Sequence, residues 1–573
     1  MKPVWPVTNT RRPPKAAAPE AADGKPGKGP CEAVMAPCRM RRPGGSRSLA
    51  RPRKGSPPAR VLPRPLFRRD HRGKRVGRHR RQPFAKLPLA GLSFMQHDAD
   101  MSDIRDSLCD APAQTPEYAQ RDHGSSLAEW DRRHVWHAFT QMAEYEPLLI
   151  ERGEGATLYD TDGRAYLDGS ASMWCNVHGH RHPRLDRAAL EQLGRVAHTT
   201  NLGLSNPTTV RLAKRLAEVA PAGLEKVFFS DDGATAIEVA LKLAFQYWLQ
   251  CGQPEPGRRR YLAIGEAYHG DTLGTIGVGG VARFGSIFQP LTFEAIRIPS
   301  PALCRQPRGS LPEEACRQGI ERLENMLTVH AGEVAAVIME PLVQAAGGIL
   351  VHPPGFLRAV REATRAHDVL LILDEVAVGF GRTGRLFACE HESVEPDFLC
   401  LAKGLTAGYL PMAATLTTAE IWNAFLGTHA ERRTFFHGHT YGGNPLAAAV
   451  ALESLAIFEE ERVLERMRPA IERLESRLEE FRGMPHVADA RSRGLAAGIE
   501  LAADPSTGTR FDPAEAIGMR ACQAARKHGA LLRPLGDVVV IMPPLCVGPA
   551  EIDRLCDAAA AGIREVCATL ENR

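Results

Sequence analysis

The sequence has no apolar run long enough to cross a membrane. Its apolar stretches are short, as in residues 369–373, whereas a transmembrane helix needs roughly 18 such residues. It also has no pair of cysteines in C-x-x-C spacing, and its thirteen cysteines are scattered along the chain. This pattern argues against a zinc ribbon or a disulfide framework and is typical of reduced thiols. We therefore expect a cytoplasmic protein with no disulfide bonds and no membrane contact.

Acidic residues are scarce at one end of the chain only. Residues 1–94 contain 24 lysines and arginines but four acidic residues, a net charge of about +20. The other 479 residues contain 48 basic and 63 acidic residues, a net charge of about −15. Because this longer part repels phosphate backbones, we expect it to bind no nucleic acid. It also exceeds the roughly 250 to 300 residues that one hydrophobic core serves, which predicts a large domain and a smaller one.

Residues 1–94 hold sixteen of the 43 prolines, and such a composition predicts a disordered basic extension. The prolines argue against the amphipathic helix of an organelle transit peptide. Few aromatic residues interleave with the basic ones, which argues against a nucleic-acid-binding arm. We expect an in-frame extension upstream of a natural start at Met95 or Met101. The predicted organisation is then a leader over residues 95–129, a large domain over residues 196–450, and a small domain built from residues 130–195 and 451–573.

Helical segments alternate with short β-branched runs from residue 200 onward, which predicts an α/β fold with a mainly parallel sheet. Strands are expected at residues 226–229, 261–264, 335–339, 369–373 and 398–401, and helices at residues 208–220, 234–249 and 444–481. A smaller α+β segment follows, with strand-like residues 494–501 and 538–542, a helix near residues 513–528 and a terminal helix. Glu340, Asp374 and Lys403 each follow a strand. Ligands bind at the carboxyl ends of such strands, so we expect these three residues at one site.

Two motifs suggest other chemistry and are rejected. Residues 379–384 satisfy G-x-G-x-x-G, but five residues separate the first glycine from the strand and no helix plainly follows, so a nicotinamide site is not expected. His178, His180 and His182 resemble a metal cluster. Histidines at this spacing share a metal only on an extended segment, which Pro183 ends, so no metal site is expected.

Four features together match the needs of pyridoxal phosphate. Lys403 opens a flexible turn after a strand and can form a Schiff base, and Asp374 can partner the pyridine nitrogen. The glycine turn at Gly233 and Ala234 begins a helix and offers N–H groups to a phosphate. Tyr268 can stack on the ring. Each feature alone has a bland explanation, such as a surface turn or a helix cap, but their combination is not expected by chance.

The sequence resembles the class III pyridoxal-phosphate aminotransferases of fold type I. The resemblance runs from about Trp130 to the C-terminus and rests on residues 373–384 (LDEVAVGFGRTG), 402–404 (AKG) and 440–445 (TYGGNP). Residues 135–142 (VWHAFTQM), 172–180 (SMWCNVHGH) and 533–536 (RPLG), with 542–544 (MPP), are similar to the biotin-pathway members, the 7,8-diaminononanoate synthases. These enzymes aminate 8-amino-7-oxononanoate, most often with S-adenosylmethionine as the amine donor.

The resemblance implies a role for individual residues. Lys403 matches the Schiff-base lysine, Asp374 the partner of the pyridine nitrogen, and Tyr268 the stacking residue. Gly233 and Ala234 match the phosphate cup, although Ala234 stands where a serine is frequent. Thr440 matches a phosphate ligand that comes from the other subunit of a homodimer. Arg533 matches the arginine that holds the substrate carboxylate. Positions of the substrate pocket are matched by Trp174, Arg382 and Gly438.

The amine donor is left open at this point. Where users of S-adenosylmethionine have Pro-Tyr and a second tryptophan, this chain has Ala138-Phe139 and Met173. Residues 139–142 and 438–441 also resemble the subgroup that uses lysine. Two further alternatives are another class III transaminase acting on an ω-amino acid or amine, and nucleic-acid binding through the basic extension.

Overall fold

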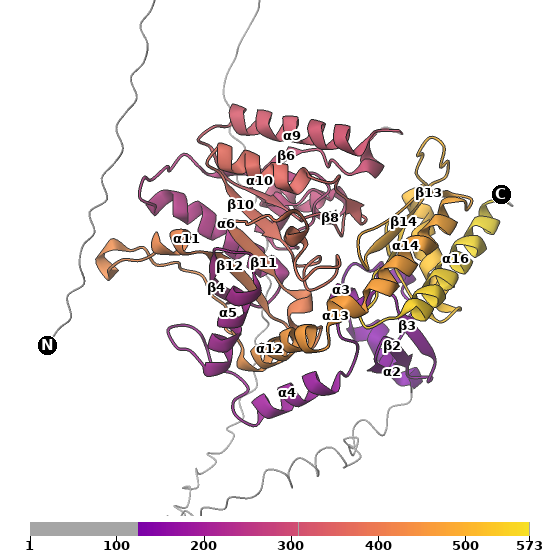
Figure 1. The fold of residues 1–573 in the computed structure, drawn as a ribbon. Helices are drawn as coiled ribbons and strands as arrows, with labels where there is room; N and C mark the ends of the chain where they lie inside the picture. Colours follow the sequence, from indigo (N-terminus) through magenta and orange to yellow (C-terminus); the bar gives the residue numbers. More distant parts are fainter. Residues whose placement is uncertain (1–123, 307–308, 572–573) are drawn as a thin grey trace, which may run out of the picture. The chain divides into compact units, whose positions relative to one another are not determined.

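The computed structural model describes residues 124–306 and 309–571 (Figure 1). The predicted extension over residues 1–94 and most of the predicted leader therefore lie outside the described residues. The first described element is helix α2 (Gly124–His134). No helix in these ranges is both long and apolar enough to span a bilayer, and every cysteine in them is a free thiol.

A seven-stranded sheet forms the centre of the fold. Its strands lie in the order β4 (Leu224–Ser230), β12 (Ala413–Thr418), β11 (Phe398–Leu401), β10 (Leu370–Asp374), β7 (Val334–Met339), β5 (Arg260–Ile264) and β6 (Ile296–Ile298). All neighbours pair in parallel except β12, which is antiparallel to both β11 and β4. The prediction of an α/β fold with a mainly parallel sheet is confirmed.

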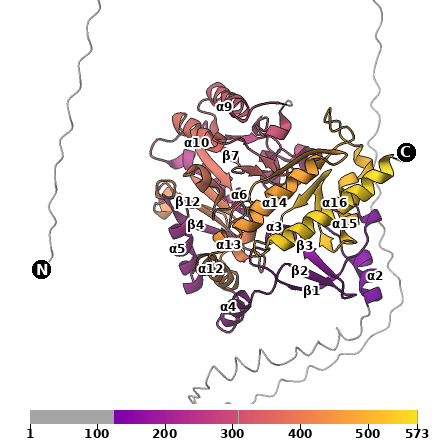
Figure 2. The same ribbon diagram turned by 45° about the vertical axis from the view of Figure 1, so that its right-hand side comes forward.

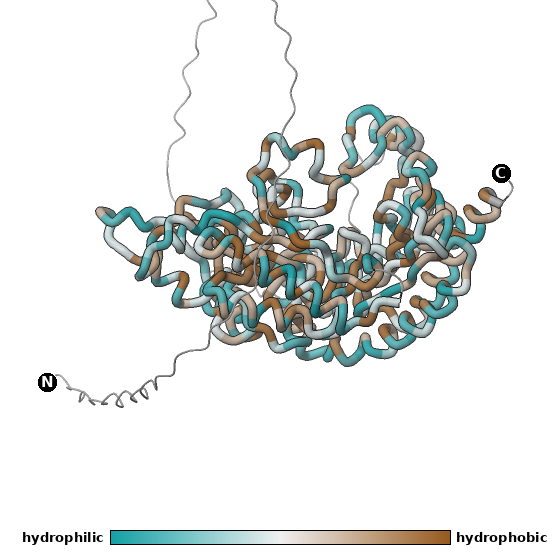
Figure 3. Tube along the Cα trace, turned by 90° about the horizontal axis from the view of Figure 1, so that it is seen from above, coloured by the Kyte–Doolittle hydropathy of each residue, from teal (hydrophilic) through white to brown (hydrophobic). Residues whose placement is uncertain are grey.

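Side chains alternate between two hydrophobic clusters across this sheet. Ile372 belongs to the cluster under helix α6 (Gly233–Gln250). Leu371 and Leu373 belong to the other cluster, which includes buried residues of α9 (Pro312–Val329), α10 (Phe356–Ala366) and α12 (Pro445–Glu460). Both faces are therefore covered by helices, which explains why the central strands read as continuous apolar runs. Hydrophobic residues gather accordingly in the interior of the fold (Figure 3).

Shorter elements complete this part of the chain. The helices are α4 (Pro183–Leu193), α5 (Pro207–Val219), α7 (Leu273–Val278), α8 (Ala282–Gly285) and α11 (Ala419–Asn423). A two-stranded ribbon joins β8 (Val343–Gln344) and β9 (Leu350–Val351). Helix α5 begins at Pro207 after Asn206, whose side chain accepts from Thr209 N, so a cap and a proline fix the start of this helix.

Two four-stranded sheets stand beside the large one (Figure 2). The first joins β1 (Ile150–Glu154), β2 (Thr157–Asp160) and β3 (Ala165–Asp168) to β15 (Ala530–Leu531). The second is antiparallel and contains β13 (Val487–Ser492), β14 (Ala497–Leu501), β17 (Val538–Ile541) and β16 (Arg533–Leu535). Helices α14 (Arg468–Arg482), α15 (Ile517–Arg526) and α16 (Pro549–Glu571) accompany these strands. The first sheet thus unites segments from both ends of the described chain.

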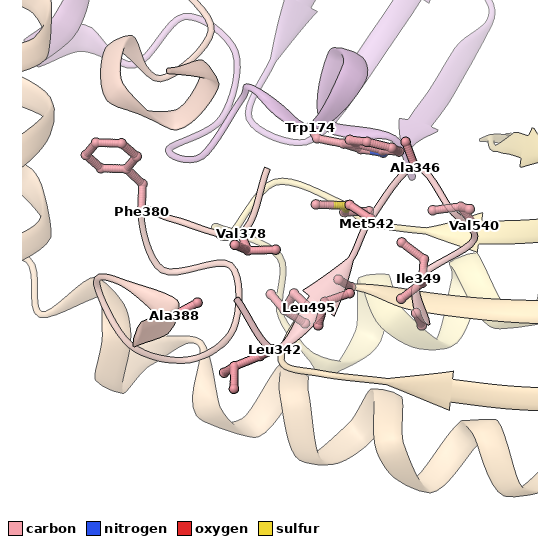
Figure 4. Packing of buried hydrophobic residues seen from close by; sticks show 14 of the residues in the cluster. Trp174, Leu342, Ala346, Ile349, Val378, Phe380, Ala388, Leu495, Val540 and Met542 are labelled. Atoms are coloured by element: carbon pink, nitrogen blue, oxygen red, sulfur yellow. The ribbon is translucent and has the colours of Figure 1, made fainter. Parts of the chain in front are cut away.

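Apolar contacts and ion pairs join these parts. Trp174, Ala346 and Met542 come from three distant segments and belong to one buried cluster (Figure 4). Arg305 forms ion pairs with Glu266 near the large sheet and with Glu500 on β14. Arg491 on β13 donates to the carbonyl oxygens of Gly348 and Ile349. These contacts therefore tie the large sheet to the smaller sheets beside it.

The predicted long helix over residues 444–481 is divided. It consists of α12, α13 (Val463–Arg466) and α14. Helix α12 ends at Glu460, Arg462 with φ +51 in the left-handed region stands before α13, and Pro469 stands in the first turn of α14. The domain boundaries predicted from the sequence stay a prediction.

Candidate active site

A cavity with a volume of about 720 Å³ opens where the central strands end. Six of the predicted site residues line it: Trp174, Gly233, Ala234, Tyr268, Asp374 and Lys403. Glu340 lines it as well. The structure thus brings together the three residues that were expected at the strand ends, because β7, β10 and β11 are adjacent and parallel.

Lys403 follows β11 and projects into this cavity. Its backbone has φ +43, a left-handed conformation that a side chain adopts at a cost. Its Nζ lies 5.4 Å from the centre of the Trp174 ring. Burial lowers the pKa of Lys403, and the carboxylates of Asp374 and Glu340 oppose that shift. The lower pKa increases the fraction of neutral amine, which is the form that attacks a carbonyl group.

Asp374 ends β10 and is buried together with a histidine. His269 Nδ1 lies 2.7 Å from Asp374 Oδ2, and the two side chains are 0% and 4% exposed. Val376 N donates to Asp374 Oδ1 at 3.0 Å. Because the carboxylate can only accept, His269 Nδ1 carries the shared proton. His269 Nε2 is buried and has no partner among the described residues. This pair presents a fixed, desolvated carboxylate to the cavity.

Tyr268 is held at its hydroxyl group and at its backbone. Its hydroxyl donates to Asp271 Oδ2 at 2.7 Å, and its backbone N–H donates to Glu340 Oε1 at 3.0 Å. Burial and the Asp271 hydrogen bond raise the pKa of Tyr268, so the phenol stays protonated. Glu340 also accepts from Ala345 N at 2.8 Å, and its burial raises its pKa to about 7. One carboxyl group thereby connects both sides of the cavity.

The start of helix α6 forms an anion-binding cup. Asp232 caps the helix by accepting from Thr235 N at 3.0 Å. The N–H groups of Gly233 and Ala234 receive no acceptor from the described chain, so they remain for a ligand at the positive end of the helix. A Cβ at position 233 would lie 2.5 Å from Val376 Cγ1, which explains the glycine. These donors fit a phosphate group.

Four predicted site residues do not line the cavity. Arg382 is 1% exposed, and its Nη1 donates to the carbonyl oxygens of Leu495 and Pro543 at 3.1 and 2.6 Å. Burial lowers the pKa of Arg382 to about 10. Arg533 begins β16, while Gly438 and Thr440 are exposed in the segment before α12. The substrate and phosphate contacts assigned to these four residues stay predictions.

The rejected motifs have structural explanations. Residues 379–384 form turns after β10 instead of opening a helix, with Gly381 and Gly384 at φ +86 and +97. The three histidines of residues 178–182 face different partners, namely Ser454, Asp168 and Glu461.

The family follows from a match over most of the chain. Residues 140–562 match the model of the family described as aminotransferase class-III. This chain is a class III aminotransferase. It is 50% identical over 445 residues to the adenosylmethionine-8-amino-7-oxononanoate aminotransferase of Geobacter sulfurreducens, which covers 77% of this chain and 98% of that protein.

Solved structures of this aminotransferase family agree with the fold. The adenosylmethionine-8-amino-7-oxononanoate aminotransferase of Methanocaldococcus jannaschii has a TM-score of 0.73 at 40% identity, covering 77% of this chain and 99% of that one. An amine transaminase from an uncultivated Pseudomonas species, solved in its PLP-bound internal aldimine form, has a TM-score of 0.72 at 34% identity, covering 75% and 98%. The expectation of fold type I is confirmed.

One wall of the aminotransferase's cavity rests on an unusual turn. Ala171, Ser172, Met173 and Trp174 all have left-handed backbones, with φ between +45 and +74. Each such residue costs roughly 1 to 2 kcal/mol when it is not glycine. The carboxylate of Asp168, 1% exposed, accepts from Ser170 N, Ser172 N and Ser172 Oγ and pairs with His180 Nε2 at 3.0 Å. Asp168 therefore holds the turn that presents Trp174 to Lys403.

The sequence-based prediction missed several site residues. His269 and Asp271 follow the predicted Tyr268 closely, but the contact of His269 with Asp374 is revealed only by the fold. Asp168 ends β3 and is a weak signal because aspartate is common after a strand. Cys175 lines the cavity next to Trp174, and burial raises the pKa of its thiol. Nothing in the spacing of these residues distinguishes them from surface positions.

Proposed function

We propose that this protein transfers an amino group to 8-amino-7-oxononanoate and forms 7,8-diaminononanoate, a step of biotin synthesis, with pyridoxal phosphate as cofactor. Support for the cofactor comes from one cavity that combines a desolvated lysine, a buried carboxylate and a helix start with free N–H groups. The substrate is suggested by the relatives named above and by the motifs around Trp174 and Arg533. Bound pyridoxal phosphate supplies the carbonyl group that takes up the amine and a ring that delocalises charge.

The protein's own residues have separable tasks in this proposal. Lys403 Nζ holds the cofactor and carries a proton between substrate and cofactor carbons. Asp374, held by His269, keeps the pyridine nitrogen protonated. Tyr268 stacks on the cofactor's ring, and the hydrogen bond from its hydroxyl to Asp271 fixes the plane of the tyrosine ring. Gly233 and Ala234 hold the phosphate through their backbone N–H groups.

We assign the keto acid's carboxylate to Arg533, since a planar guanidinium matches a carboxylate better than an ammonium does. The donor is S-adenosylmethionine in this proposal, with lysine as the alternative. The test is to incubate the purified holoenzyme with the keto acid and each donor separately and to measure the diamine. If no diamine forms with either donor but the enzyme converts other ω-amino acids or amines, the second candidate is favoured, an amine transaminase like the Pseudomonas neighbour.

We further propose that the protein is a cytoplasmic homodimer. Exposed apolar side chains surround the segment that carries Gly438 and Thr440: Phe436 is 83% exposed and Tyr441 is 64% exposed. Apolar surface of this kind marks a protein interface. Thr440 does not line its own cavity, which suits a ligand of the phosphate in the other subunit.

The dimer proposal has a complementation test. Lys403→Ala and Thr440→Asp chains should each be inactive, but a mixed dimer has one site with both native residues. Random pairing should return about a quarter of wild-type activity, since half of the dimers are mixed and each mixed dimer has one intact site out of two. Mixed dimers without activity would place the phosphate site within one chain.

A further inference from the structure

Two arginines lie beside a row of aromatic rings that begins at the cavity. Tyr268 lines the cavity and meets Phe284 edge to face, with ring centres 5.4 Å apart. Phe284 meets Phe139 in the same way at 5.4 Å. Arg283 in α8 places its Cζ 4.7 Å from the Phe284 ring centre, and Arg533 in β16 places its Cζ 6.0 Å from that of Phe139. The row thus has one guanidinium at its middle ring, Phe284, and one at the ring farthest along it from the cavity, Phe139.

Neither guanidinium has a carboxylate partner in the described ranges. The hydrogen bond of Arg283 is a long one, 3.5 Å from Nη2 to the carbonyl oxygen of Ala346, which lines the cavity. The Nη1 atom of Arg283 packs closely on Gly536 in the turn after β16. A Cβ added to this glycine would lie only 2.7 Å from Nη1. Arg305 and Arg491, by contrast, both form ion pairs with Glu500.

Arg283 keeps part of its surface exposed and Arg533 is half-buried, and the charge of Arg533 acts on Arg283. Burial lowers the pKa of Arg283, the charges of Arg510 and Arg533 lower it further, and only Asp537 opposes them. Burial also lowers the pKa of Arg533. These like charges repel each other and Asp537 offsets only part of that repulsion, so an anion that contacts both guanidinium groups is favoured. The aromatic row beside them offers apolar surface but no hydrogen-bond partner for a polar chain.

We propose that Arg283 acts with Arg533 as a second ligand for the carboxylate of a substrate with an extended apolar chain, and that the ring row holds that chain. The inference rests on the proposed function in taking this carboxylate to be that of the keto acid. It adds a binding residue that the sequence motifs do not contain, since Arg283 lies in a short helix that none of them covers.

The test uses the holoenzyme and nonanoate, a chain of similar length with one carboxylate and no reacting group. Calorimetry should show nonanoate binding to wild type and roughly 10- to 100-fold weaker binding to Arg283→Gln. Arg533→Gln should weaken binding as well, and the double variant should depart from the product of the single effects. Nonan-1-ol should bind all variants alike. Unchanged cofactor absorbance and melting temperature show that the variants are folded.

Arg510→Gln is the matched control, because it removes one charge from the same electrostatic neighbourhood without a ring contact. Equal losses in Arg510→Gln and Arg283→Gln would mean a long-range effect and overturn the proposal. So would nonanoate affinity within twofold of wild type in Arg283→Gln, or no nonanoate binding by wild type. If wild type binds nonanoate through Arg283 but forms no diamine, the proposed function fails and this inference stands. If diamine forms and the Arg283→Gln KM for the keto acid is unchanged, this inference fails alone.

Discussion

The hydrogen bond between His269 and Asp374 allows a quantitative prediction of cofactor affinity. The pair is 2.7 Å apart and nearly inaccessible to water, so His269→Ala removes a buried hydrogen bond to a carboxylate. Such a bond contributes about 1.5 to 3 kcal/mol. If Asp374 contacts the cofactor only when it is held in place, the Kd for pyridoxal phosphate should rise by roughly 10- to 150-fold. Titration of the apoenzyme with cofactor, followed by visible absorbance, measures this constant.

A second buried histidine supplies the control for this measurement. His352 is 5% exposed, and neither ring nitrogen has a partner in the described part of the chain. It packs edge to face on Phe356 at 5.4 Å, outside the cavity lining. His352→Phe should bind the cofactor as wild type does. The reasoning is refuted if His269→Ala binds the cofactor within twofold of wild type, or if both variants lose affinity equally.

Three further outcomes are expected. Lys403→Ala should fold and lack the visible absorbance of lysine-bound cofactor, since no other lysine lines the described cavity; a native spectrum would contradict its assignment. Burial raises the pKa of Glu375 from 4.5 to about 7, so its stabilising contribution is complete below pH 4.5 and is lost as the pH rises through 7. The unfolding free energy of wild type relative to Glu375→Gln should fall by about 3 kcal/mol between pH 4 and 8 in denaturant titrations, and a pH-independent difference would count against it. Met173 has φ +74 and is exposed, so Met173→Gly should raise the unfolding free energy by about 1 kcal/mol and Met173→Val should lower it. Equal melting temperatures for the two variants would contradict this prediction.

The sequence was informative where a strand is buried on both faces. Residues 369–373 and 398–401 are apolar throughout, so the polar residues that follow them were recognisable as site candidates. Strand β12 was missed because its residues, AATLTT, are all small or hydroxylated except one leucine, although five of the six are buried. Contacts such as His269 with Asp374 join residues 105 positions apart, and no local pattern encodes them.

The same limit applies to the helices and to the arginine beside the rings. The break at Arg462 depends on a left-handed residue that is not glycine, for which the sequence gives no sign, whereas Pro469 was a readable signal. Arg283 sits in a four-residue helix without periodicity. Its neighbours are defined by the packing of Phe139 and Phe284, residues that lie far apart in the chain.

The left-handed turn at residues 171–174 bears on how this cavity can change during evolution. Its backbone path is set by Asp168 from behind, not by the side chains that face the ligand. Trp174 is the residue of this turn that lines the cavity, so substitutions there can alter the shape of the cavity without moving the wall. Glycine is usually a costly replacement, but at positive φ it relieves conformational strain while it enlarges the space. A mutational route to bulkier substrates thus opens at the turn, where the relief of strain offsets part of the packing lost with the buried Trp174, and it closes for any β-branched residue at the same positions.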